Sequence, residues 1–250
     1  MSRLSVSCPK WLAVAVLATA FGLGSANTSQ AAFVFVGSRA TLAGTDSLDW
    51  GTKGPALTTL TNPFSITSTG GVVATVSQAT GTFLRVDEGG PGWNGHFALG
   101  DKLLSTNYNN SGNNGPMTIT FGAALSGAGA KMHSDYPTTF TATVEALAAN
   151  GSVLASFTYT GTGGSGSSDD VAPFAGISTT GGSTFFALRY TGISGVTNPN
   201  DFAINKFDFR LGQAPPTNAV PLPAGMILAL SGLPALGFAG WVRRRLTTAA

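Results

Sequence analysis

The sequence predicts an all-β fold, specifically an antiparallel β-sandwich, and three observations support this prediction. β-branched and aromatic residues occur in short runs that alternate with polar residues, as expected for strands buried on one face. Gly, Asn and Pro residues separate these runs and supply turns. Only 10% of the residues are charged, whereas 16 Phe are available for a core. A packed sandwich therefore fits the composition better than low-complexity disorder.

Residues 1–31 are predicted to be a secretory signal peptide with a helical apolar segment. Arg3 and Lys10 form the positive region, and residues 11–23 form the apolar region. Residues 29–31 (Ser-Gln-Ala) fit the cleavage site for signal peptidase, with Ala26 as an earlier alternative. The single cysteine of the chain is Cys8, so removal of this segment leaves a domain without disulfides.

Residues 32–213 are predicted to form one β-sandwich domain of about 180 residues, which is enough to bury a sizeable core. This region contains 8 of the 13 Lys and Arg residues and all 11 Asp and Glu residues, so its net charge is −3. The basic character of the whole chain comes from its two ends. Without a basic patch that includes interleaved aromatic residues, the sequence predicts no nucleic-acid partner.

The first half of this domain contains five predicted strands. A run that begins with FVFV predicts the first, and two runs separated by Ser68–Gly71 predict a pair. In residues 117–121, Met and Ile alternate with Thr, which predicts a strand with one buried face. The predicted ranges are 33–38, 64–67, 72–77, 82–86 and 117–121.

The clearest element is a β-hairpin around Asn150-Gly151, a dipeptide typical of tight hairpin turns. Residues 139–146 alternate Thr or Glu with Phe, Ala and Val, and residues 153–159 alternate in the same way on the return strand. Residues 161–168 (GTGGSGSS) are predicted to be a flexible loop, and residues 185–190 form the next strand.

The last predicted strand, residues 202–211, changes phase. Phe202 and Ile204 are apolar at even positions, whereas Phe207 and Phe209 are apolar at odd positions. Both sets can face one core only if an extra residue is inserted, so we predict a β-bulge near Asn205-Lys206. Alternatively, the two halves bury opposite faces in different places.

The C-terminal end has three parts that predict a membrane-directed segment. Residues 214–219 (APPTNA) are predicted to be a linker. A short motif then follows, formed by Val220, Pro221, Leu222, Pro223 and Ala224. The uncharged residues 225–242 would span about 27 Å as a helix, which matches a bilayer core. The basic residues that follow are predicted to stay on the cytoplasmic side; they are Arg243, Arg244 and Arg245.

This arrangement resembles the PEP-CTERM protein-sorting domain, in its VPLPA-CTERM variant, over residues 220–250. The commonest family form has Glu between the two prolines, where this chain has Leu222. The resemblance implies an exosortase-type processing enzyme as partner, a transient inner-membrane intermediate, and final placement at the surface or in the extracellular matrix of a Gram-negative bacterium. It also implies an association with exopolysaccharide.

The middle of the chain resembles the mature domains that carry this sorting signal, which implies a jelly-roll-like β-sandwich. The resemblance rests on segments 46–50 (DSLDW), 94–101 (NGHFALGD), 115–121, 140–151 and 201–209.

The sequence contains no catalytic constellation, so we predict that the protein is not an enzyme. The mature region has no G-x-S-x-G motif, no cysteine, and two distant histidines, His96 and His133. The histidine spacing does not suggest zinc, and no cofactor is predicted. A structural calcium ion is an alternative to solvated acids in the loops that contain Asp46, Asp49, Asp87 and Asp201; Glu88, Asp169 and Asp170 lie in the same kind of loop.

Carbohydrate contact is predicted for the Gly-rich loop that contains Trp93, Asn94 and His96, with Trp50 as a further candidate and Tyr108 among asparagines. Indole rings serve as stacking surfaces, although Trp50 and Trp93 also fit the ends of a core. The main functional prediction is a secreted, exosortase-processed, non-enzymatic surface or matrix protein. The alternatives are a secreted polysaccharide hydrolase, which needs two convergent carboxylates, and a purely structural subunit that packs against its own copies through unprotected edge strands.

Overall fold

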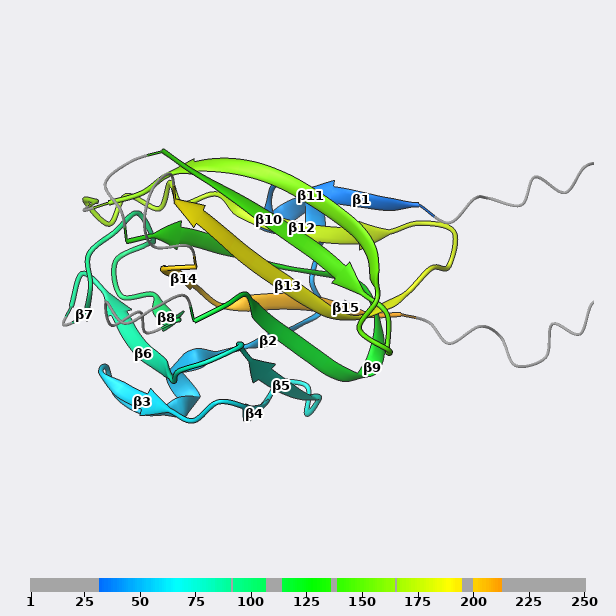
Figure 1. The fold of residues 1–250 in the computed structure, drawn as a ribbon, viewed down its shortest axis with the longest axis horizontal. Helices are drawn as coiled ribbons and strands as arrows, with labels where there is room; N and C mark the ends of the chain where they lie inside the picture. Colours follow the sequence, from blue (N-terminus) through cyan, green and yellow to red (C-terminus); the bar gives the residue numbers. More distant parts are fainter. Residues whose placement is uncertain are drawn as a thin grey trace, which may run out of the picture.

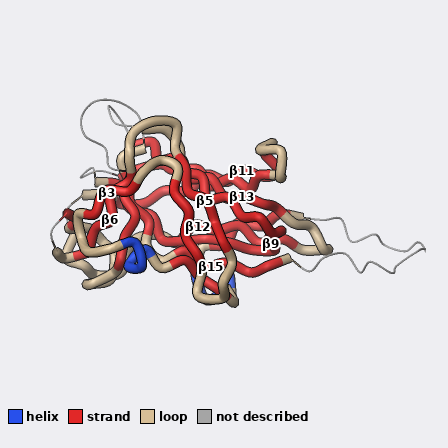
Figure 2. The backbone as a smooth tube through the Cα atoms, turned by 90° about the horizontal axis from the view of Figure 1, so that it is seen from below, coloured by secondary structure: helices blue, strands red, loops and turns tan. Residues whose placement is uncertain are grey.

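In a computed structural model of the chain, the described residues are 32–90, 92–106, 114–135, 139–164, 166–194 and 200–212. These residues form an almost entirely antiparallel β-structure, with helix confined to short segments (Figure 2). Within these ranges, no helix is long and apolar enough to cross a membrane. The predicted signal peptide, linker, sorting motif and span 225–242 lie outside the described residues, as does Tyr108.

One layer of the fold contains six paired segments (Figure 1). In spatial order they are β4 (Phe64–Thr67), β5 (Val73–Ser77), the first part of β9 (Met117–Ser134), β13 (Phe185–Ser194), β10 (Thr139–Leu147) and β11 (Val153–Thr162).

The other layer begins with β1 (Phe33–Val36), β12 (Phe174–Thr179), the second part of β9, β15 (Phe207–Leu211) and β2 (Asp46–Leu48). It continues from the end of β9 through β14 (Phe202–Ile204), β8 (Lys102–Ser105), β6 (Phe83–Glu88) and β3 (Thr58–Leu60), with β7 (Gly92–Trp93) beside β6. The helical segments are α1 (Arg39–Leu42) and the 3-10 helix η1 (Trp50–Lys53).

β9 connects the two layers because its two halves pair with different strands. Residues 117–121 pair with β13 and β5, whereas residues 127–134 pair with β12, β15 and β14. Small residues let β12 approach closely, since a Cβ added at Gly129 would lie 2.7 Å from the Cα of Gly176. The sequence predicted only the first five residues of β9 because residues 122–130 are mostly Gly, Ala and Ser.

Aromatic side chains fill the space between the layers. Phe121 of β9 packs on Phe209 of β15 with ring centroids 4.7 Å apart, and Tyr190 of β13 contacts Phe207 at 6.5 Å. The tyrosine hydroxyl donates a hydrogen bond to the carbonyl of Ala175 at 2.9 Å, so the buried polar group is satisfied. The all-β prediction is therefore confirmed, with a core of the kind that a two-layer sandwich needs.

The predicted hairpin is confirmed over nine residue pairs between β10 and β11. Its turn contains Gly151 at φ +82°, a left-handed conformation that glycine adopts without strain. The inward-facing residues of β10 are buried as predicted. Val153 differs from the prediction, since it was expected among the inward-facing apolar residues of the return strand and is 48% exposed at the start of β11.

The predicted β-bulge near Asn205-Lys206 is confirmed. Ile204 pairs with Met132, whereas Asp208 pairs with Gly129. Between these two pairs, residues 205–207 lie opposite only residues 130 and 131 of β9, so one extra residue is inserted. Asn205 occupies the interruption and its side-chain oxygen accepts a hydrogen bond from the Lys131 backbone at 3.0 Å. The strands β2, β3, β7, β8 and β12 were not predicted from residue patterns, because few residues in each show alternation.

Candidate functional site

The two tryptophans that were predicted as sugar-stacking surfaces are buried. Trp50 is 0% exposed and its ring nitrogen donates a hydrogen bond to the carbonyl of Asn205 at 2.8 Å. Trp93 is 7% exposed and packs against Phe97. These positions correct the prediction that Trp50 and Trp93 offer ring faces to a glycan. Of the predicted contacts, Asn94 is exposed and His96 is partly exposed.

The loop after β7 is held by a second loop, residues 166–172, through a series of backbone hydrogen bonds. Gly166 donates to the carbonyl of Asn94 at 3.2 Å, and Ser168 donates to Gly95 at 3.1 Å. The backbone of Asp170 donates to the carbonyl of Phe97, and that of Ala172 donates to the carbonyl of His96. In the predicted flexible loop 161–168, Gly166 and Ser168 are thus held by hydrogen bonds, and residues 161 and 162 belong to β11.

Glycine is required where these two loops meet. A Cβ at Gly166 would lie 1.9 Å from the carbonyl oxygen of Gly95, which no side chain can tolerate. A Cβ at Gly95 would lie 2.6 Å from Nε1 of Trp93 and 2.8 Å from Nδ1 of His133. The glycines therefore allow the loops to close over His133.

The loops assemble what we call the histidine cluster: His96, His133, Asp169, Trp93, Phe97 and Glu88. The rings of His96 and His133 lie 5.2 Å apart, although 37 positions separate them in the sequence. His133 also contacts the rings of Trp93 at 6.0 Å and Phe97 at 5.8 Å. The pKa of His133 is lowered to about 4, mainly by burial and also by the neighbouring His96.

A carboxylate orients the more exposed member of the pair. Nδ1 of His96 lies 2.9 Å from Oδ1 of Asp169, and the hydroxyl of Ser167 donates to the other carboxylate oxygen at 3.2 Å. The hydrogen bond to His96 is the main reason that the pKa of Asp169 is lowered. This contact directs the other ring nitrogen of His96 away from Asp169.

Several buried polar atoms of the cluster have no hydrogen-bond partner among the described residues. They are both ring nitrogens of His133, Nε1 of Trp93 and Oε2 of Glu88. The second carboxylate oxygen of Glu88 is satisfied, since it accepts from the backbone of Gly95 and the hydroxyl of Ser168, each at 2.8 Å. The interior of the cluster thus contains donors and acceptors that no described protein group satisfies.

The geometry of the cluster does not resemble nucleophilic catalysis. Within the described part of the chain, neither histidine ring has a hydrogen bond to a serine or threonine hydroxyl. Ser167 donates to Asp169, and Ser168 donates to Glu88, so both nearby hydroxyls are directed at carboxylates. An activated serine would instead donate to a histidine nitrogen.

The four acids predicted as calcium ligands occupy separate places. Asp46 accepts hydrogen bonds from Ser47, Ser68, Thr69 and Gly70, which lowers its pKa against the opposing effect of burial and holds the β4–β5 turn. Asp49 caps η1, and Asp87 pairs with Arg85 and Lys102. In the described ranges, no three His, Cys, Asp or Glu side chains are grouped to hold a metal ion.

Asp201 forms a different kind of site with Asp135, beside β14. The pKa of Asp201 is raised to about 7, mainly by burial and also by the neighbouring Asp135 carboxylate. The pKa of Asp135 is also raised by burial. Sequence reasoning missed this pair because 66 positions separate the two residues and only the pairing of β9 with β14 brings them together.

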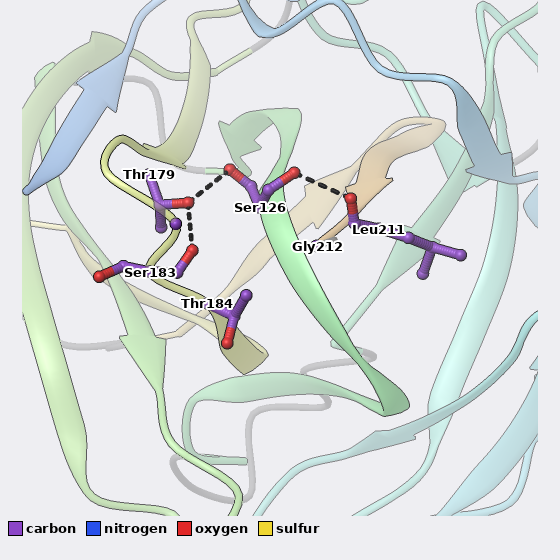
Figure 3. A pocket seen from close by; sticks show the side chains of 7 residues that line it. Ser126, Thr179, Ser183, Thr184, Leu211 and Gly212 are labelled. Carbon is purple, nitrogen blue, oxygen red and sulfur yellow. Dashed lines mark hydrogen bonds between the residues drawn. The ribbon is translucent and has the colours of Figure 1, made fainter. Parts of the chain in front are cut away.

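A hydroxyl-lined pocket of about 180 Å³ lies where β15 ends, beside Ser126 of β9 and Thr179 at the end of β12 (Figure 3). Two of its hydroxyls are already used, because Ser126 donates to the carbonyl of Leu211 and Thr179 donates to the carbonyls of Ser126 and Ser183. None of the predicted site residues lines this pocket. Its volume is also below the roughly 300 Å³ typical of ligand sites.

Comparisons with known proteins do not assign the chain to a family. No family model matches it, and no curated protein does. Among solved structures, the enzymatically active domain of tailspike protein 4 from bacteriophage CBA120 aligns at 12% identity with a TM-score of 0.27. The alignment covers 74% of this chain and 20% of that chain, so the chain spans a fifth of the length of that structure.

Proposed function

We propose that this protein is an exported, exosortase-processed and non-enzymatic component of a bacterial surface or extracellular matrix, associated with exopolysaccharide. In this proposal the domain is a jelly-roll-like sandwich, the signal peptide directs export, and the C-terminal segment holds the protein at the inner membrane until the motif at residues 220–224 is cleaved.

The C-terminal sequence of residues 220–245 carries this proposal, and the positions of the two ends of the described domain agree with it. β1 begins and β15 ends at the same end of the fold, whereas β7 lies at the other (Figure 1). Ala32 accepts a hydrogen bond from Thr180, and Gly212 donates one to Ala124. The hydroxyl of Thr179, next to Thr180, donates to the carbonyl of Ser126, close to Ala124, at 3.2 Å. A membrane tail that follows Gly212 would therefore leave the histidine cluster facing away from the membrane.

We expect the protein recovered from the culture medium of its native host to start after residue 31 and to end near residues 220–224. Intact-mass measurement of medium and membrane fractions tests this prediction directly. Replacing Pro221 and Pro223 by alanine should leave an uncleaved, membrane-bound species, whereas Pro215→Ala is a matched control that should be processed normally. A native membrane species that ends at Ala250 would mean that the tail is an ordinary anchor, and would overturn exosortase processing.

The exposed surface of the loop after β7, beside the histidine cluster, is the part of the domain that we assign to polysaccharide. Asn94 is exposed and His96 is partly exposed in the loop that follows β7. β7 itself lies at the end of the fold away from the start of β1 and the end of β15 (Figure 1). A double Asn94→Ala and His96→Ala variant should reduce co-sedimentation with the exopolysaccharide of the host by about tenfold, as expected when two hydrogen bonds of about 0.5–1.5 kcal/mol are lost. Thr67→Ala, at an exposed position of β4, should bind as the unmodified protein does.

The same incubation separates the binding proposal from the hydrolase alternative. Release of reducing ends from the polysaccharide would contradict a non-enzymatic role, and its loss in Asp201→Asn would assign the activity to the Asp135–Asp201 pair. Unchanged co-sedimentation of the double variant, with no release of reducing ends, would overturn the assignment of Asn94 and His96.

A further inference from the structure

The two layers of the fold have edges of very unequal length. The edge strands β1, β2, β3 and β4 contain three or four residues each. β11 is also an edge strand, because it pairs with β10 on one side and with no other strand in the described ranges. It contains ten residues and lies at the outer margin of its layer (Figure 1).

β11 lacks the features that usually protect an edge strand from pairing with another chain. Its sequence, VLASFTYTGT, contains no charged residue and no proline. The irregularity in its pairing with β10 lies at Ala146 and Leu147, near the turn, so the register is regular from Ala155 to Thr162. The outward residues Ser156, Thr158 and Thr160 are exposed, and Leu154 is 41% exposed.

The free edge of β11 is also held in place before any partner binds. Phe157 and Tyr159 point into the fold, where each ring lies 6.0 Å from the ring of Phe35 on β1. The Asn150-Gly151 turn fixes β11 against β10 through nine residue pairs. An ordered strand loses little further conformational freedom when it pairs, which favours association.

We propose that β11 pairs antiparallel with β11 of a second copy of this chain, which joins the two outer sheets into one. A two-fold axis makes the contact self-complementary, since the same residues face each other from both copies. Charge favours this occupant, because an uncharged strand meets no like-charge repulsion from its own copy, and Ser and Thr side chains opposite one another form favourable cross-strand pairs. This pairing does not depend on polysaccharide or on the histidine cluster.

The test measures the mass of the processed protein by light scattering after size-exclusion chromatography, over a concentration series. We expect the mass to double as concentration rises. Thr158→Lys with Thr160→Lys places lysines of both copies along the shared edge and should raise the dimer dissociation constant at least tenfold. Thr139→Lys with Thr141→Lys is the matched control, because these exposed residues lie on the same face of the adjacent strand, and Thr141 is directly opposite Thr160.

Hydrogen–deuterium exchange of the unmodified protein gives a second readout that does not depend on a variant. Amides of β11 should become more protected as concentration rises, whereas amides of β4 should not change. A mass that stays monomeric over the whole series would overturn the proposal. So would equal dissociation constants for the two lysine variants, or concentration-dependent protection that excludes β11.

Discussion

Replacing Trp50 by alanine should lower the free energy of unfolding by about 3–5 kcal/mol, the range typical of large-to-small changes at buried aromatic positions. Trp50 is 0% exposed and belongs to the main core. Its removal leaves a cavity and also deprives the carbonyl of Asn205, at the bulge between β14 and β15, of its indole donor. Chemical denaturation monitored by circular dichroism measures the change.

Two further variants separate the contributions to this effect. Trp50→Phe keeps most of the buried apolar surface but loses the ring N–H, so it should cost about 1–3 kcal/mol. Leu99→Ala changes a side chain that is 76% exposed and should alter stability by less than about 0.5 kcal/mol. A cost below about 1 kcal/mol for Trp50→Ala would mean that Trp50 is not part of a closely packed core.

Opposite pH dependences of stability are expected from His133 and Asp201. The pKa of His133 falls from 6.5 to about 4 in the folded protein, so only the unfolded chain takes up this proton between those values. The contribution of neutral His133 to the free energy of unfolding is therefore complete above pH 6.5 and falls by about 3 kcal/mol toward pH 4. The pKa of Asp201 rises from 3.8 to about 7, so its contribution is complete below pH 3.8 and is lost as pH rises to 7, by about 4 kcal/mol.

The pH-dependent contributions of His133 and Asp201 to stability partly cancel in the unmodified protein, and substitutions separate them. Asp201→Asn should be more stable than the unmodified protein at pH 8, and this difference should disappear near pH 4. His133→Leu should show the reverse trend, with its largest relative gain near pH 4. Denaturation curves at intervals between pH 4 and 8 measure both differences. A pH-independent difference for either variant would mean that the group titrates alike in the folded and unfolded chains.

Local residue patterns were sufficient to predict the strands that alternate over five or more residues. The hairpin of β10 and β11 followed from alternation and from Asn150-Gly151, and the bulge followed from the change of phase between Ile204 and Phe207. Strands β2, β3, β7 and β8 contain two to four residues, too few for a period to be visible, whereas β1 and β4 were predicted from their aromatic and β-branched residues. The second half of β9 was missed for another reason, since its Gly and Ala residues serve the close approach of β12.

The candidate site was only partly predictable. Asn94 and His96 were predicted from the composition of one loop, but His133 and Asp169 reach that loop through β9 and through residues 166–172. Trp50 and Trp93 satisfied the composition of a sugar-binding surface and are nevertheless buried. Composition reports which groups a segment contains, whereas exposure depends on the segments that pack over it.

The sequence by itself determined the all-β class, the alternating strands and the position of the bulge, because each depends on the spacing of side chains along one segment. The tertiary structure alone decided which histidines and acids meet, which tryptophans are buried and which long strand keeps a free edge among the described residues. These outcomes depend on register between segments that are far apart in the chain. A shift of one residue in such a register would turn each side chain to the opposite face, and no local pattern records which distant strand supplies the partner.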